Sequence, residues 1–197
     1  MNTKALVATG MIVVPLLVAA GTRLWVSGQQ TPAQGISDVI VLPARVFGVT
    51  DRNYLSDAVA EALFNHLAKV EGMESRIGKE DETSDAFVLS TITADSGALQ
   101  LNLEIIDRKT QRVIWRNPYQ APESKYLEMI RAAGEGLRSV LRPTSSPVRS
   151  FSGVSQNSEA ELAFREAMYY RTSDPERSAA AFKRASQIDP SLSASKP

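Results

Sequence analysis

The chain has 197 residues, enough for one ordinary domain and a small appendage. Its 22 Lys and Arg residues balance 22 Asp and Glu residues, so it lacks the basic excess that drives binding to nucleic acid, and we expect no such partner. The absence of Cys excludes disulfides, thiolate metal sites and a lipidated N-terminal Cys, and a single histidine, His66, excludes a histidine-rich metal centre and argues against a His-dependent triad.

An uncharged apolar segment follows the first four residues. It covers residues 5–21 and is rich in Val, Leu, Ala and Ile. A membrane-spanning helix needs about 20 apolar residues, a length that is reached if the segment continues past Arg23 to Val26. We therefore predict a transmembrane anchor in residues 1–27, with membrane contact through residues 5–26.

The same segment also fits two other interpretations. Small residues at positions 18–20 are typical of a cleavage site, which would make it a signal peptide, and a buried core helix is the third alternative. If the segment is a transmembrane anchor or a signal peptide, the rest of the chain is exported. We expect a single-pass inner-membrane protein with its N-terminus inside and its bulk in the periplasm or, after signal cleavage, a protein secreted to the periplasm.

Residues 28–37 are rich in Gln, Gly, Pro and Ser and form a predicted linker. A buried strand is expected over residues 38–43, and apolar residues at helical spacing predict a helix over 54–70, capped by Asp51 or Asn53. After it, a short strand is expected around residues 75–77.

Three further strands and a second helix complete this domain. Alternating residues predict strands over 86–94, 98–106 and 112–115, joined by short turns as an antiparallel meander with Val113 and Trp115 on one side. An apolar stripe then predicts a helix over residues 123–141. The fold class is therefore α+β: a mixed four- or five-stranded sheet with two helices on one face, over residues 38–142.

A second linker is predicted over residues 143–157, which are rich in Pro, Ser and Gly. Residues 158–171 and 175–188 then have the pattern of paired helices, so the segment 158–197 is expected to be a helical hairpin and tail.

Several short motifs in the central domain carry a family resemblance. They are Val41-Leu-Pro43, Tyr54-Leu-Ser-Asp57, Ile105-Ile-Asp107, Thr110, Ile114-Trp115 and Tyr119. With them, residues 38–141 resemble the TolB amino-terminal-like domain. The resemblance implies a periplasmic domain of bacterial membrane-anchored regulators of the winged-helix, adenylate cyclase and serine/threonine kinase types. Two positions depart from the pattern: Gln111 replaces a turn glycine, so that turn must differ or be strained, and Ala44 replaces a phenylalanine.

The C-terminal hairpin is similar to one tetratricopeptide repeat. Small, aromatic and proline positions match, and the candidate residues for repeat packing or protein binding are Leu162, Ala167, Tyr170, Phe182, Ala185 and Pro190. At least about three repeats are usually needed to bury a continuous core. A solitary repeat must therefore dock on the α/β domain, pair with another chain or be partly unfolded.

No catalytic motif is recognisable in the sequence. It has no Gly-rich phosphate loop after a strand, no nucleophile elbow and no kinase signature. We interpret His66 as a boundary histidine with a satisfied hydrogen bond, and the carboxylates of residues 79–82 as a solvated loop. We therefore expect no enzyme activity, no catalytic residue, no metal and no cofactor.

These features predict a non-catalytic, membrane-anchored periplasmic interaction module. The resemblance implies that it is the sensory or scaffolding part of a transmembrane regulator and acts through protein–protein contacts. Two alternatives are a C-terminal remnant of a serine/threonine kinase or adenylate cyclase type regulator, and an envelope-assembly accessory protein. The expected partners are proteins of the cell envelope, a transmembrane regulator, or a second copy bound through the solitary repeat.

Overall fold

The computed structural model describes residues 35–48, 50–80, 82–142 and 154–195. The predicted anchor or signal segment, residues 1–27, and most of both linkers lie outside these ranges. Within them, every helix is too short or too polar to span a bilayer.

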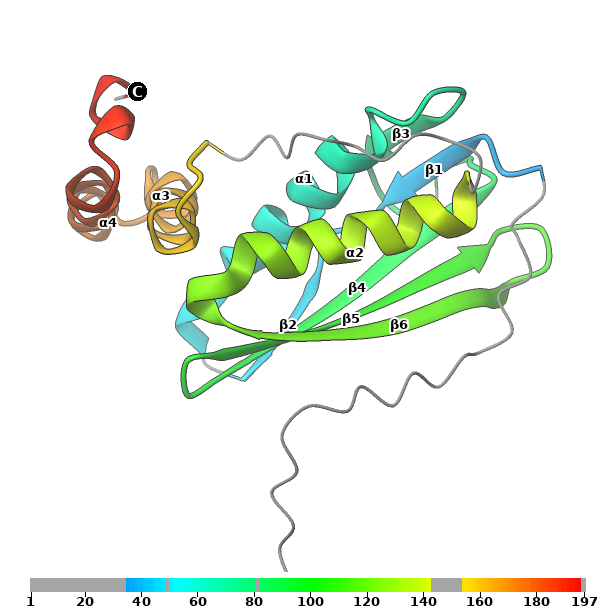
Figure 1. Ribbon diagram of the computed structural model, residues 1–197, viewed down its shortest axis with the longest axis horizontal. Helices are drawn as coiled ribbons and strands as arrows, with labels where there is room; N and C mark the ends of the chain where they lie inside the picture. The colour runs from blue at the N-terminus through cyan, green and yellow to red at the C-terminus, as the bar shows by residue number, and fades with distance from the viewer. Residues whose placement is uncertain (1–34, 49, 81, 143–153, 196–197) are drawn as a thin grey trace, which may run out of the picture.

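A mixed six-stranded sheet forms the centre of the structure (Figure 1). Its strands are β1 (Asp38–Val41), β2 (Arg45–Gly48), β3 (Glu74–Ile77), β4 (Ala86–Asp95), β5 (Ala98–Asp107) and β6 (Arg112–Pro122). The order across the sheet is β3-β1-β4-β5-β6, with β2 also paired to β4. Strand β1 pairs in parallel with β3 and β4, and β2 pairs in parallel with β4. Strands β4, β5 and β6 form the predicted antiparallel meander.

The sheet has one strand more than the four or five that we predicted. The additional strand is β2, which continues along β4 beyond the end of β1. Pro43 lies in the interruption between them, and because proline has no backbone N–H it cannot extend a strand ladder. The first predicted strand, residues 38–43, therefore ends at Val41, and β2 beyond Pro43 is a strand that the prediction missed.

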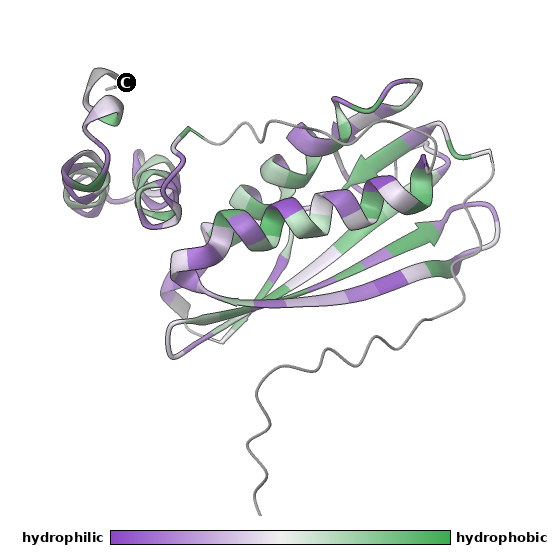
Figure 2. Ribbon diagram, in the orientation of Figure 1, coloured by the Kyte–Doolittle hydropathy of each residue, from purple (hydrophilic) through white to green (hydrophobic). Residues whose placement is uncertain are grey.

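Two helices cover one face of the sheet, as predicted (Figure 1). Helix α1 (Leu55–Leu67) begins without a side-chain cap, so the expected capping by Asp51 or Asn53 is wrong, and it ends three residues earlier than predicted. Helix α2 (Tyr126–Leu141) follows a 3-10 turn, η2 (Glu123–Lys125). Figure 2 shows the apolar stripe on α2 and the apolar residues of the sheet, which together form the core between the layers.

Glycines allow α2 to approach both of its neighbours closely. A Cβ at Gly134 would overlap the imidazole ring of His66 on α1, and a Cβ at Gly136 would overlap the Tyr119 hydroxyl on β6. The absence of a side chain at both positions explains why these glycines occur inside a helix, where each costs about 1 kcal/mol relative to Ala.

The last strand differs from its prediction in length and register. It extends from Arg112 to Pro122, and the ladder shifts between Ile105 and Ile106. Ile105 pairs with Trp115, whereas Ile106 pairs with Val113. The bulge therefore places the side chains of Val113 and Trp115 on opposite faces of the sheet. Trp115 is buried and Val113 is exposed, so the prediction that they share a side is wrong.

A helical hairpin follows the α/β domain. It consists of α3 (Ser158–Tyr170), α4 (Pro175–Ile188) and a terminal 3-10 turn, η3 (Pro190–Ser195). The side chain of Asn157 caps α3 by accepting from the backbone N–H groups of Glu159 and Ala160, and Asp174 caps α4 by accepting from that of Arg177.

Candidate interaction surface of the helical hairpin

The hairpin is docked on the α/β domain through α3. Leu162 is buried and belongs to the main hydrophobic core of that domain rather than to the small core of the hairpin. The backbone N–H of Leu127, in the first turn of α2, donates to the hydroxyl of Ser158 at 3.1 Å. These contacts join the start of α3 to the start of α2.

A nearly buried ion-pair network reinforces this contact. The Arg165 guanidinium on α3 donates to Glu61 on α1 at 2.5 Å and to Glu161 at 2.9 Å. The side chains of Arg165 and Glu161 are almost completely enclosed, whereas Glu61 is partly exposed. Such charges are tolerated in the interior because each of them has a partner of opposite sign.

A second polar contact holds the other end of the hairpin. Arg177 on α4 donates to the backbone carbonyl of Asp51 at 3.0 Å and lies over the ring of Tyr170, 4.0 Å from its centroid. Arg177 also donates to Glu166 at 2.9 Å, so α3 and α4 are joined at this point. Of the three outcomes expected for a solitary repeat, docking on the α/β domain is the one observed.

The structure separates the six predicted interaction residues into three groups. Phe182 and Ala185 belong to the hairpin core, where the ring of Phe182 packs edge-to-face on Phe164 with centroids 5.6 Å apart, and Ala167 is buried where α3 meets α4. Leu162 lies in the α/β core. Tyr170 lies beneath Arg177, and Pro190 is exposed at the start of η3.

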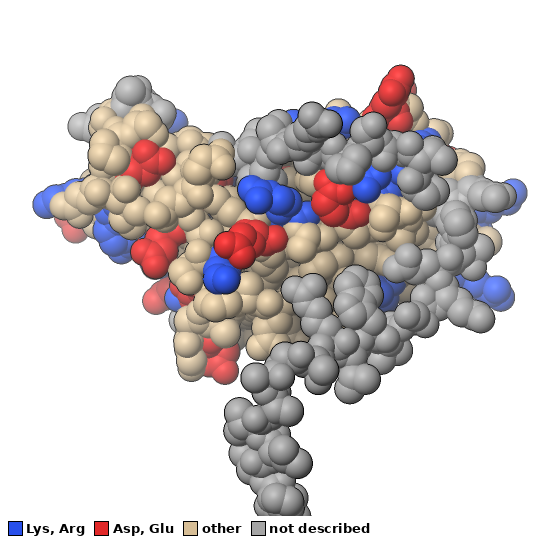
Figure 3. Space-filling model, in the orientation of Figure 1, with Lys and Arg blue, Asp and Glu red and all other residues tan. Residues whose placement is uncertain are grey.

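The surface of the hairpin that does not dock contains exposed apolar side chains. Met168 and Ile188 are each about two-fifths exposed, and Tyr169, exposed to the same extent, faces a groove that it shares with Val46 and Asp57 of the α/β domain. Figure 3 shows that uncharged residues predominate on the visible hairpin surface, with acidic and basic groups around them.

The polar contacts of the docked hairpin were missing from the sequence prediction. Glu61 and Arg165 are 104 positions apart, so no local pattern connects them. The only signal in the sequence is the spacing of Glu161 and Arg165, which places both side chains on one face of a helix.

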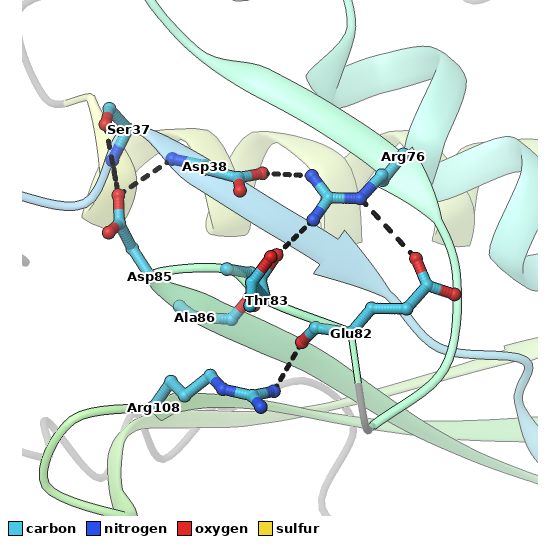
Figure 4. Close-up of polar contacts among 9 residues, drawn as sticks. Ser37, Asp38, Arg76, Glu82, Thr83, Asp85, Ala86 and Arg108 are labelled. Carbon is cyan, nitrogen blue, oxygen red and sulfur yellow. Dashed lines mark hydrogen bonds and ion pairs between the residues drawn. The ribbon is translucent and has the colours of Figure 1, made fainter.

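A separate polar cluster lies where the chain enters the α/β domain (Figure 4). The Asp85 carboxylate accepts from the backbone N–H groups of Ser37 at 2.8 Å and of Asp38 at 3.0 Å, and these bonds lower its pKa below the usual value. Arg76 donates to Asp38 at 2.5 Å and to the carbonyl of Thr83. The cluster therefore fixes the start of β1 against the segment that precedes β4.

Neither of these clusters has the features of a catalytic centre. No group of three or more His, Asp or Glu side chains among the described residues is arranged to hold a metal ion.

His66 is buried rather than at a boundary, and neither of its ring nitrogens makes a well-formed hydrogen bond, although Nε2 lies 3.4 Å from a Glu135 oxygen. Burial lowers the pKa of His66.

Part of the chain is similar to solved structures. A PelC L103M dodecamer from Paraburkholderia phytofirmans is 13% identical with a TM-score of 0.44, and the match covers 60% of this chain and 96% of that chain. TolB from Acinetobacter baumannii is 9% identical with a TM-score of 0.45, and the match covers 60% of this chain and 31% of that chain. The LpoB C-terminal domain from Salmonella enterica is 14% identical with a TM-score of 0.32, over 46% of this chain and 87% of that chain.

Matches at this level describe partial similarity of fold, and we draw no functional conclusion from them. No family model matches the sequence, and no curated protein matches it.

Proposed function

We propose that this chain is a non-catalytic interaction module of the bacterial cell envelope. In this proposal residues 5–26 anchor it in the inner membrane, and the α/β domain and the hairpin lie in the periplasm. The observation that carries the proposal is the docked hairpin, in which Leu162 completes the α/β core and Arg165 joins α3 to α1.

Docking supports an interaction role because it leaves one hairpin surface available. A single repeat cannot bury its own apolar face, and here the α/β domain covers one side of α3. On the rest of the hairpin Met168, at the end of α3, and Ile188, at the end of α4, are exposed. A rigidly held helix pair with exposed apolar residues is suited to protein–protein contact, because little conformational entropy is lost on binding.

The partner in this proposal is an envelope protein or a transmembrane regulator, for which the module is the sensory or scaffolding part. The motifs that resemble the TolB amino-terminal-like domain support this choice, as does the apolar segment that precedes the domain. Among the predicted residues, Phe182 and Ala185 would maintain the hairpin, and Tyr170 would fix its position against Asp51.

Two measurements test this function. A reporter enzyme that is active only after export, fused to the C-terminus, should be active, whereas a cytosolic reporter at the same position should be inactive. A photo-crosslinking amino acid at Met168 of the full chain should then join to an envelope protein in cells, and the same group at the exposed position Glu176 should not. Equal crosslinking at both positions, or a silent export reporter, would refute the proposal.

A further inference from the structure

Strand β2 has one edge that no described strand covers. It pairs only with β4, over Thr91–Ala94, while β3 pairs with β1 and ends opposite Val41. Phe47 in the middle of β2 is 56% exposed, the largest value among the large apolar residues of the described chain. Proteins normally protect such edges with charge, proline or a covering element, so an open edge beside an exposed aromatic ring indicates a surface for strand pairing.

A shallow groove of about 340 Å³ lies beside this strand. It is lined by Ala44, Val46, Asn53, Ser56, Asp57 and Tyr169. Tyr169 is the one contribution from the hairpin, and it reaches the groove because Leu162 and Arg165 hold α3 on the α/β domain. Docking of the hairpin therefore completes one wall of the groove.

The register of β2 defines what an added strand would meet. Val46 pairs with Ile92 and packs on the core side of the sheet, whereas Phe47 pairs with Thr93 and points to the opposite face. Side chains of a strand alternate between the two faces, so an extended segment beside β2 would direct alternate residues toward the groove and toward Phe47. Residues directed toward the groove would meet the polar side chains of Asn53, Ser56 and Asp57, whereas apolar residues fit the other face, where Phe47 is exposed.

The charge beside the groove selects between partners. Asp57 is exposed and makes no ion pair with another described residue. Asp51, close by in the sequence, is also exposed, and its carboxylate makes a long ion pair of 3.6 Å with Arg177. A Lys or Arg side chain on the bound segment would gain an electrostatic partner here, whereas an acidic segment would be repelled.

We propose that the open edge of β2 and this groove bind an extended segment of a partner protein by strand addition, and that the segment alternates apolar with basic residues. The proposal rests on the interaction function above and names the chemistry of its partner. Backbone hydrogen bonds to β2 supply the affinity, and the groove and Asp57 supply the selectivity.

The test uses the full chain in detergent micelles and a fluorescein-labelled synthetic peptide of eight alternating Lys and Val residues. The peptide should raise the fluorescence anisotropy and slow hydrogen exchange at the backbone amides of residues 45–48. A peptide with Glu in place of Lys should bind at least tenfold more weakly, and so should one with Pro at its centre, because proline removes a ladder hydrogen bond.

Variants separate the groove from the rest of the surface. Asp57→Lys should weaken binding of the Lys–Val peptide at least tenfold, and Asp57→Asn, which keeps the shape of the side chain, should weaken it about threefold. Phe47→Ser should also weaken binding. The matched control is Val113→Ser, which removes an exposed apolar residue from the opposite edge strand and should leave the affinity unchanged.

Any of three results with the peptide would overturn the proposal: no binding, equal affinity for wild type and Asp57→Lys, or slowed exchange on β6 instead of β2. Protection of residues 45–48 that rises with protein concentration, without peptide, would also overturn it, because a second copy would then occupy the edge. If these results coincide with crosslinking at Met168, the interaction function stands and only this site fails. If crosslinking at Met168 is absent while the peptide protects β2, the hairpin proposal fails and this site stands.

Discussion

Arg165 and Glu61 form an ion pair of 2.5 Å although 104 positions separate them in the sequence. Arg165 lies on α3 and Glu61 on α1, so this contact connects the hairpin to the helical layer of the α/β domain. Glu161 shares the same guanidinium at 2.9 Å and is almost completely buried. The position of the hairpin therefore depends on a charged side chain that satisfies two carboxylates at once.

Replacing Arg165 should loosen the hairpin. In Arg165→Gln the buried Glu161 carboxylate loses its counter-charge, and breaking a buried pair costs about 3 kcal/mol of the free energy of unfolding. Urea denaturation followed by tryptophan fluorescence measures the loss, and limited proteolysis should cut the hairpin sooner. The control is Arg184→Gln, which removes an exposed partner of Glu166 and should change stability by less than about 1 kcal/mol. Equal effects of the two substitutions would contradict the role given to Arg165.

The contact between α1 and α2 depends on the missing side chain at Gly134. Gly134→Ala should lower the free energy of unfolding by about 2 kcal/mol, because the new methyl group would overlap the His66 ring. The sign of this change is informative, because the higher helix propensity of Ala would by itself stabilise α2 by about 1 kcal/mol. Thermal unfolding of the double variant Gly134→Ala with His66→Ala measures the coupling energy between the two positions. Part of the stability lost in Gly134→Ala should be recovered in this double variant. An increase in stability in Gly134→Ala alone would show that the helices can move apart without cost.

The turn between β5 and β6 contains a strained residue. Gln111 has a φ of +56°, in the left-handed region that favours glycine, as the departure from the family pattern predicts. Gln111→Gly should therefore raise the free energy of unfolding by about 1 kcal/mol. Gln100→Gly, within β5, should have the opposite sign, because glycine weakens a strand interior. Denaturant midpoints of the two variants provide the comparison, and a loss of stability in Gln111→Gly would show that the turn has no strain to release.

Buried His66 should make stability depend on pH. Burial lowers the pKa of His66 below its usual value, Lys69 and Arg138 lower it further, and Glu135 opposes this. The unfolded chain therefore takes up a proton more readily than the folded one, so the stabilisation is complete above the unfolded pKa of about 6.5 and declines as the pH falls from there. One proton limits the slope to about 1.4 kcal/mol per pH unit.

Urea unfolding at pH 7.5 and pH 5.0 measures this decline. The reference is His66→Phe, which keeps an aromatic ring against Gly134 but does not titrate, and it should show a flatter dependence between the two pH values. An identical slope in the wild type and in His66→Phe would assign the pH dependence to other groups.

Most of the secondary structure could be predicted because it depends on local patterns. Alternation in residues 98–106 and the apolar stripe of residues 123–141 report which side of each element is buried, and both elements are observed close to those bounds. The prediction failed where a single residue changes the pattern. Pro43 separates β1 from β2, a strand that was not predicted, and the bulge at Ile105 and Ile106 reverses the side of Val113 relative to Trp115.

The candidate site was less predictable for a physical reason. The sequence predicted the hairpin, because side chains that contact within a helix pair repeat at fixed spacing, and two of the predicted residues, Phe182 and Ala185, lie in its small core. The sequence could not show that Leu162 packs in the core of the α/β domain instead of the core of the hairpin. Burial of an apolar side chain is favourable against any apolar surface, so spacing alone does not name the surface.

By itself, the sequence determined the α+β class, the meander, the two covering helices and the helical pair, since each follows from periodicity and turn residues within a short segment. Only the tertiary structure decided where the hairpin lies and which groups surround it. The pairing of Arg165 with Glu61 and the reach of Tyr169 toward β2 require segments more than a hundred residues apart to meet. Such contacts form only when the whole core packs, because their energy depends on distance and burial in space rather than on separation along the chain.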